Sequence, residues 1–153
     1  MSLAIVYTRA ALGIEAPLIT VEVHLSNGLP GLTMVGLPET TVKEARDRVR
    51  SALINSGYAF PAKKITINLA PADLPKEGGR YDLPIALALL VASEQLNTTR
   101  LNQYEFVGEL ALTGGLRGVP GAIPSAMEAI KAGRRIVVSS DNAAEVGLIG
   151  GSD

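Results

Sequence analysis

Residues 19–28 have the sequence ITVEVHLSNG, and this stretch decides the class of fold. Its apolar side chains alternate strictly with polar ones, which is the pattern of a β-strand with one face buried. The Asn27-Gly28 pair that follows favours a tight turn between strands. We therefore expect a strand over 19–26 whose polar face, with His24, points to solvent rather than into a catalytic triad.

On either side of this strand, strands come first and then alternate with helices. Short apolar or alternating runs predict further strands over 3–7, 32–35, 64–69, 106–107 and 136–138. Apolar residues at helical spacing predict helices within 37–57, 83–96, 123–132 and 143–148. The segment 108–121 is rich in glycine and is expected to form turns. This order predicts an α/β (α+β) fold, a mixed sheet with packed helices.

Length and composition indicate a globular protein. The chain has 153 residues, which corresponds to one domain over 1–153 at about 150 residues per domain. Apolar residues make up 47% and charged residues only 19%, so most of the chain has a substantial core. The longest apolar run, 83–92, is half the length of a membrane span, and 1–7 does not resemble a signal peptide. We therefore expect a cytoplasmic protein with no membrane partner.

Several classes of site are excluded by residue counts. The chain contains no cysteine, which excludes disulfides, cysteine nucleophiles and cysteine-type zinc sites. Its one histidine cannot build a multi-histidine metal site within one chain. The net charge of −1 and the scarcity of aromatic residues do not indicate a strongly basic or base-stacking nucleic-acid binder.

Two groups of charged residues remain as candidates for chemistry. Asp73, Glu77 and Asp82 belong to an aperiodic segment, 70–82, and paired carboxylates can transfer protons or hold Mg²⁺. A simple mixed-charge loop is the other interpretation. No Gly-x-x-x-x-Gly-Lys-Ser/Thr sequence is present, so the chain has no P-loop.

The second group is a basic stripe on the helix predicted within 37–57. Lys43, Arg46 and Arg50 share one helical face, where they would contact phosphates or the carboxylates of a partner. Glu44 and Asp47 dilute the positive charge. An ordinary solvated helix face is therefore the alternative to a nucleic-acid site.

Three sequence blocks carry a resemblance to a known family. The first is LPGLTMVGLP at 29–38, followed by the arginine-rich helix. The second is ITINLAPADLPKEG at 65–78 with YDLPIA at 81–86, and the third is GELALTGGLR at 108–117. With these blocks, essentially the whole chain resembles the N-terminal domain of the YifB/ComM family, which are magnesium-chelatase-related AAA+ ATPases.

This resemblance implies a fold and a larger context. The fold would be the Lon-protease-like form of the ribosomal protein S5 domain 2 fold. The whole protein would continue past residue 153 into a AAA+ module, which would hold ATP and Mg, and a C-terminal magnesium-chelatase-like region. ComM proteins are associated with natural transformation as hexameric DNA helicases that drive branch migration. The implied partners are single-stranded or branched DNA, the AAA+ module and sister subunits.

The kinship with Lon proteases also raises a protease hypothesis, which the residues themselves test. In Lon the nucleophilic serine follows a Pro-Lys-Asp-Gly-Pro sequence, whereas here the sequence PKEGG at 75–79 is followed by Arg80. Alignment on Gly108-Glu109 places Ile123 where Lon has its lysine. An arginine is no alkoxide nucleophile and an isoleucine accepts no proton, so we expect no peptidase activity.

The expected function is that of a non-catalytic accessory domain that assists the placement of DNA or subunits. The alternative is a protein–protein interaction or oligomerisation module without DNA affinity. The residues expected to be exposed and to bind DNA or a partner are Arg46, Arg50, Lys76, Arg80 and Arg117.

Arg80 is singled out because it stands at the entrance of the helix predicted over 83–96. A helix N-terminus favours anions, so Arg80 would strengthen a phosphate or carboxylate site there. A structural pair with Asp73, Glu77 or Asp82 is the other interpretation. Under the first interpretation, Arg80→Ala weakens ligand binding and leaves stability almost unchanged.

Overall fold

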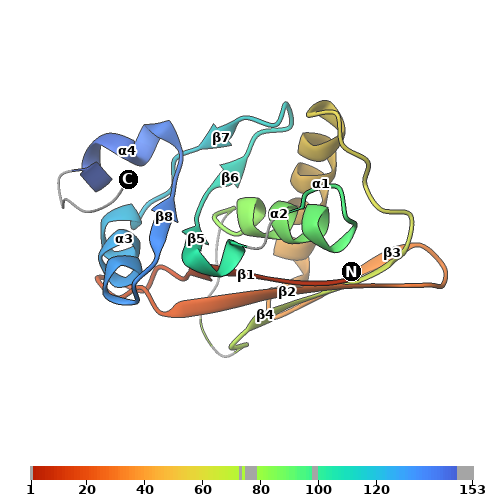
Figure 1. The fold of residues 1–153 in the computed structure, drawn as a ribbon, viewed down its shortest axis with the longest axis horizontal. Coiled ribbons are helices and arrows are strands. Elements are labelled where there is room, and N and C mark those ends of the chain that lie inside the picture. Colours follow the sequence, from red (N-terminus) through yellow and green to blue (C-terminus); the bar gives the residue numbers. More distant parts are fainter. Residues whose placement is uncertain (1, 73, 75–78, 98–99, 148–153) are drawn as a thin grey trace.

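The computed structural model describes residues 2–72, 74, 79–97 and 100–147 (Figure 1). Within them a six-stranded sheet has the strand order β3-β4-β2-β1-β5-β8. Its strands are β1 (Leu3–Arg9), β2 (Leu18–Ser26), β3 (Gly31–Val35), β4 (Lys64–Ala70), β5 (Tyr104–Phe106) and β8 (Arg135–Val137). The β1–β2 and β2–β4 pairs are antiparallel, whereas the β3–β4, β1–β5 and β5–β8 pairs are parallel. The predicted mixed sheet is therefore confirmed.

Helices pack against this sheet at two places. The helices are α1 (Glu39–Asn55), α2 (Asp82–Ala92), α3 (Ala122–Lys131) and α4 (Ser140–Gly147), with a short 3-10 helix at Leu101–Gln103. Figure 1 shows α1 and α2 above the β1–β2–β4 part of the sheet, and α3 and α4 at the opposite end beside β8. In the part of the chain that the structure describes, no helix is long and apolar enough to cross a membrane.

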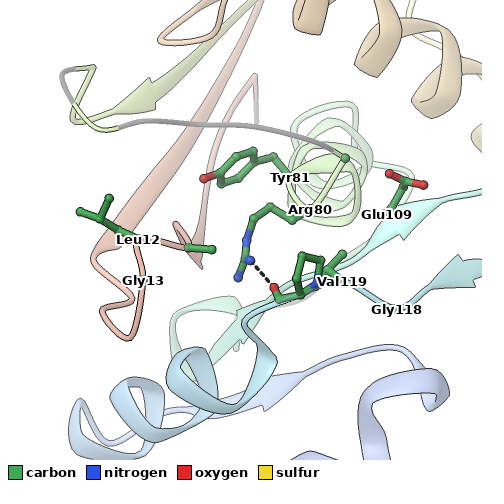
Figure 2. A pocket seen from close by; sticks show the side chains of 10 residues that line it. Leu12, Gly13, Arg80, Tyr81, Glu109, Gly118 and Val119 are labelled. Atoms are coloured by element: carbon green, nitrogen blue, oxygen red, sulfur yellow. Dashed lines mark hydrogen bonds between the residues drawn. The ribbon is translucent and has the colours of Figure 1, made fainter.

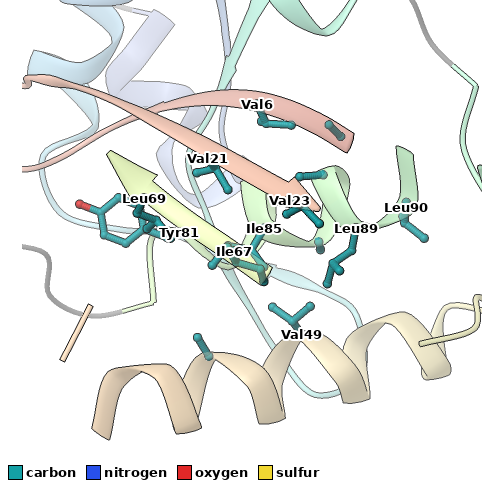
Figure 3. Close-up of a cluster of buried hydrophobic side chains, with 14 of the residues drawn as sticks. Val6, Val21, Val23, Val49, Ile67, Leu69, Tyr81, Ile85, Leu89 and Leu90 are labelled. Atoms are coloured by element: carbon teal, nitrogen blue, oxygen red, sulfur yellow. The ribbon is translucent and has the colours of Figure 1, made fainter. Parts of the chain in front are cut away.

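The alternation in residues 19–26 builds the main core. Ile19, Val21, Val23 and Leu25 are all buried, whereas His24 is exposed, as predicted. The strand register places Val21 between Val6 of β1 and Leu69 of β4, so the apolar rows continue across the sheet. Figure 3 shows these rows facing α2 and Val49 of α1. A one-residue slip would turn every one of these side chains to solvent, which is why the register is strongly specified.

The helix α2 ends four residues earlier than the apolar pattern predicts. The hydroxyl of Ser93 donates to the carbonyl of Leu89 at 2.7 Å, and Glu94 has a φ of 62°. A left-handed residue at this position stops a helix, and the N–H of Leu96 then returns to the carbonyl of Leu90. The apolar content of the sequence therefore does not predict where α2 ends.

The buried face of α3 differs from the predicted one. The pattern predicts one apolar face made of Ile123, Ala126, Met127 and Ile130, but the buried residues are Ala122, Ser125, Ala126 and Ala129. Met127 is 46% exposed and Ile130 is 37% exposed. Small side chains allow α3 to approach the sheet and α4 closely, and the larger apolar ones are left outside.

The glycine-rich segment contains a hairpin that the pattern does not predict. Strands β6 (Glu109–Leu110) and β7 (Leu116–Arg117) pair antiparallel and form a separate two-stranded sheet. Gly114 adopts a φ of 99° in the turn, which suits glycine. Strands of two residues are too short to show alternation, so only the turn was predictable here.

Candidate functional site

A cavity of about 610 Å³ lies where the N-terminus of α2 meets the β1–β2 turn, β6 and the segment before α3 (Figure 2). The residues that line it include three glycines and three polar or charged side chains: Gly13, Gly79, Gly118, Arg80, Tyr81 and Glu109. A Cβ atom at Gly79 would overlap the Glu109 carboxylate, so this side chain lies directly against the Gly79 backbone. The cavity therefore combines open backbone with charged and hydroxyl groups.

Arg80 lies in the interior and not on the surface, which corrects the prediction of an exposed arginine. It is 4% exposed. Its Nε donates to the carbonyl of Arg9 at 3.0 Å, its Nη1 to the carbonyl of Pro120 at 2.7 Å and its Nη2 to Ser125 Oγ at 2.8 Å. These acceptors are neutral, and burial lowers the pKa of Arg80 below its usual value. The side chain therefore ties α2 to β1 and α3.

Tyr81 is the second functional side chain of the cavity. It is 2% exposed, and its hydroxyl is buried without a hydrogen-bond partner in the described part of the chain. Figure 2 shows the ring extending from α2 toward Leu12. Burial raises the pKa of Tyr81 to about 12, although the positive charge of Arg80 opposes this shift. The phenol therefore stays protonated at neutral pH and has a proton to donate.

Asp82 does not pair with Arg80, as one interpretation of the sequence proposed, but with Arg48 of α1. Arg48 donates from Nε at 2.6 Å and from Nη2 at 3.2 Å, and the N–H of Leu110 donates at 3.1 Å. The carboxylate is buried and connects α1, α2 and β6. Asp73 and Glu77, the other two carboxylates of the predicted group, lie outside the described residues. Asp82 thus has a structural role in this geometry.

The burial of Asp82 predicts a pH-dependent stability. Burial raises its pKa to about 6, against the hydrogen bonds from Arg48 and Leu110. Because the folded chain holds this proton more tightly than the unfolded chain, the free energy of unfolding should fall as pH rises from about 4 to about 6, by up to about 3 kcal/mol. Urea unfolding at a series of pH values measures this, and Asp82→Asn should lack the step. Identical pH profiles for the two proteins would contradict it.

A buried ion cluster lies directly behind the cavity. The carboxylate of Glu105 on β5 accepts from Arg9 Nε at 2.6 Å, Arg9 Nη2 at 2.9 Å and Arg134 Nη1 at 3.0 Å. The Arg134 guanidinium also lies over the ring of Tyr7, 4.1 Å from its centroid. The cluster was not predicted, because its members are far apart in sequence. The only signal was an acidic residue directly before the apolar pair Phe106-Val107.

Residues 21–142 match the family described as Subunit ChlI of Mg-chelatase. The chain belongs to this family. It is 83% identical to an uncharacterized protein YifB of Salmonella typhimurium, over 97% of this chain and 29% of the relative. It is 64% identical to Competence protein ComM of Haemophilus influenzae, over 97% of this chain and 29% of the relative.

These matches identify an N-terminal ChlI-like domain of the YifB/ComM Mg-chelatase-related proteins. The uncharacterized protein YifB of Escherichia coli is 80% identical over 99% of the chain and 30% of its own length. The chain thus spans about 30% of the length of these relatives. Among the residues that the structure describes, no group of three or more His, Asp or Glu side chains is arranged to hold a metal ion.

The candidate binding residues of this YifB/ComM domain lie in separate places. Arg46 and Arg50 are one turn apart on α1; Arg46 is 3.7 Å from Asp47 Oδ1, and Arg50 lies over the ring of Phe60, 5.6 Å from its centroid. Arg117 is exposed on β7, 4.0 Å from Glu109 Oε2. Lys76 lies outside the described residues. Of the predicted residues that the structure describes, only Arg46 and Arg50 lie close together on one helix, and Arg46 is half-buried, not exposed as predicted.

Proposed function

We propose that this YifB/ComM chain is a non-catalytic accessory domain of a AAA+ ATPase and assists the placement of DNA or sister subunits. The observation that carries the proposal is Arg80. It occupies the position of the Lon nucleophile in the resemblance, and its guanidinium donates to three neutral oxygens in the interior. A side chain held in this way stabilises the site and supplies no nucleophile.

The position that corresponds to the Lon lysine, the partner of the nucleophilic serine, supports the same proposal. Ile123, at the position of the Lon lysine, precedes Ser125 by two residues, and Ser125 accepts from Arg80 at 2.8 Å. The start of α3, which carries Ile123, is therefore joined to Arg80 by a hydrogen bond. We propose on this basis that the sheet and helices take the Lon-like form of the ribosomal protein S5 domain 2 fold, with the peptidase dyad lost.

We propose that the catalytic activity of the whole protein lies outside this chain. The chain spans about 30% of its relatives, so about 70% of their length lies outside it. We assign to that part the AAA+ module, which would bind ATP and Mg, and the branch-migration helicase activity connected with natural transformation. The cytoplasm is the compartment where such a protein would meet DNA.

The surface of α1 is the proposed contact with DNA. Lys43 and Arg50 are exposed and Arg46 is half-buried, and the three share one side of the helix. Cationic side chains along one helix face can contact successive phosphates. Glu44 and Asp47 are exposed on the same helix and reduce the local positive charge. We therefore expect weak binding that depends on salt.

Fluorescence anisotropy of labelled single-stranded and branched DNA tests this contact, titrated from about 20 to about 200 mM salt. We expect affinity to fall steeply with salt because counterions are released from the phosphates. Arg46→Glu and Arg50→Glu should each weaken binding several-fold and reduce the salt slope by about 1. Lys131→Glu on α3 makes the same change in net charge and should leave binding unchanged.

The proposed DNA contact fails if micromolar protein shows no binding at the lowest salt. It also fails if Lys131→Glu weakens binding as much as the two α1 variants, because the effect would then follow net charge alone. An equal loss of DNA affinity in all three variants would show that the α1 surface has no specific role in DNA binding.

The alternative function, an interaction module without DNA affinity, is favoured by a different surface. Met127 and Ile130 are exposed on α3, one turn apart, although both are large and apolar. Such side chains suit contact with a protein. This function predicts self-association that is insensitive to salt, measured by sedimentation velocity at low and high salt, together with the absence of DNA binding.

A further inference from the structure

The interior behind the cavity has an excess of positive charge. Three buried or half-buried arginines lie there, because Arg9 and Arg134 both bind Glu105 and the backbone of Arg9 accepts from Arg80. Arg9 and Arg134 share the single carboxylate of Glu105, which makes no ion pair with Arg80 in the described part of the chain. Arg80, the one that lines the cavity, donates only to neutral oxygens among the described residues. A desolvated cation in this position attracts an anion.

The donors needed to hold an anion are also present. A guanidinium has five N–H groups, and Arg80 uses three of them in hydrogen bonds within the described chain. Tyr81 lines the same cavity, and its protonated hydroxyl is buried with no hydrogen-bond partner among the described residues. Buried polar groups are normally hydrogen-bonded, so an unpaired hydroxyl here requires an explanation. The N-terminus of α2, which begins at Asp82, adds a favourable partial charge.

The rest of the lining restricts where the anion can sit. Glu109 lines the cavity on the side of β6, where its carboxylate would repel a second anion. Figure 2 shows Tyr81 and Leu12 on the other side of Arg80 from Glu109. Gly13 and Gly118 leave space along the wall, and the volume of about 610 Å³ is that of a small-molecule site.

We propose that this cavity binds a small molecule through one oxyanion group, a phosphate or a carboxylate, seated on the Arg80 guanidinium and the Tyr81 hydroxyl. Both groups donate hydrogen bonds to the oxyanion, and Arg80 supplies the counter-charge. The site lies within the fold and does not use Arg46 or Arg50. It is therefore independent of the DNA contact proposed for α1, and either proposal can fail without the other.

The test is a titration of the ¹⁵N-labelled chain followed by NMR. Inorganic phosphate is the probe in one arm and acetate in the other, and sodium chloride keeps the ionic strength equal. We expect saturable shifts of the amide signals of Gly79, Tyr81 and Gly118, beyond those in chloride. The arm that saturates at the lower concentration identifies the source of the oxyanion as phosphate or carboxylate.

Tyr81→Phe is the decisive variant, because it removes only the unpaired hydroxyl. We expect the dissociation constant of the preferred probe to increase about tenfold, the usual loss for a hydrogen bond to a charged group. Stability should be unchanged or higher, since no hydrogen bond of the fold is lost. Tyr58→Phe, the same change at an exposed tyrosine, is the matched control and should bind as the unmodified chain does.

Two results would overturn the proposal. One is that neither phosphate nor acetate shifts the amide signals of the cavity beyond the chloride control. The other is that Tyr81→Phe binds the probe with an unchanged dissociation constant, because the hydroxyl would then take no part in holding it. Neither test uses an Arg80 variant. Such a variant would also destabilise the fold, so a loss of binding could not be assigned to the site alone.

Discussion

Replacing Glu105 by alanine is expected to lower the free energy of unfolding by about 3–5 kcal/mol. Its carboxylate is buried and accepts three hydrogen bonds, two from Arg9 and one from Arg134. Without it, two guanidinium groups remain at the junction of β1, β5 and β8 with no carboxylate between them. Removing one member of a buried ion cluster costs more than the cluster itself contributes, because the remaining charges stay desolvated.

Urea unfolding followed by circular dichroism measures this loss for Glu105→Ala. The matched control is Glu128→Ala on α3, where the carboxylate pairs with Lys131 at 3.1 Å on the surface. Exposed pairs contribute about 0–1 kcal/mol, so the control should remain close to the unmodified chain. Equal losses for the two variants would contradict the account of a buried cluster.

Replacing Arg80 by alanine is expected to lower the free energy of unfolding by about 2–4 kcal/mol. The variant leaves the carbonyls of Arg9 and Pro120 and the hydroxyl of Ser125 without the donor they have in the fold. Buried acceptors that lose their partner carry a desolvation cost. This expectation reverses one of the two drawn from the sequence, in which Arg80 is exposed and its replacement weakens ligand binding but leaves stability almost unchanged.

The matched control for Arg80→Ala is Arg50→Ala, which deletes the same side chain from the exposed face of α1. Arg50 lies over Phe60 and is exposed, so its loss should cost no more than about 1 kcal/mol. Thermal unfolding of both variants measures the difference. If Arg80→Ala unfolds at the same temperature as the unmodified chain, Arg80 has no structural role.

Most of the fold was predictable because its core has a simple period. The alternation around Val21 and Val23 specifies which face of β2 is buried, and the apolar content of 83–92 specifies a helix buried on most sides. The position of each strand in the sheet was not predictable in the same way. The β1–β5 pair joins segments about a hundred residues apart, and no local pattern records such a pairing.

The candidate site was less predictable, because burial of charged residues depends on distant partners. A sequence shows that Arg80 is charged but not that Arg9, Pro120 and Ser125 supply acceptors for it. The sequence therefore predicts either an exposed arginine or one paired with a nearby carboxylate. The buried face of α3 was also hard to predict from the sequence. Hydrophobicity predicts that Met127 is buried in preference to Ala129, but Ala129 is the buried residue because α3 packs closely and only a small side chain fits.

The structure consequently divides the basic residues into two groups with different roles. Arg9, Arg48 and Arg80 hold buried or partly buried hydrogen bonds and stabilise the junctions between helices and the sheet. On α1, Arg50 is exposed and Arg46 is half-buried, and both are proposed to contact a partner. Only the second group should affect DNA binding without affecting stability.

One measurement tests the central claim, that this domain helps to place DNA through α1, most directly. It is an NMR titration of the ¹⁵N-labelled chain with a branched DNA at about 50 mM salt, within the range where phosphate contacts are strong. The account predicts that the shifted amide signals belong to residues 43–50 of α1 and that added salt reverses the shifts. Shifts confined to 123–130 of α3, or none at all, would contradict it.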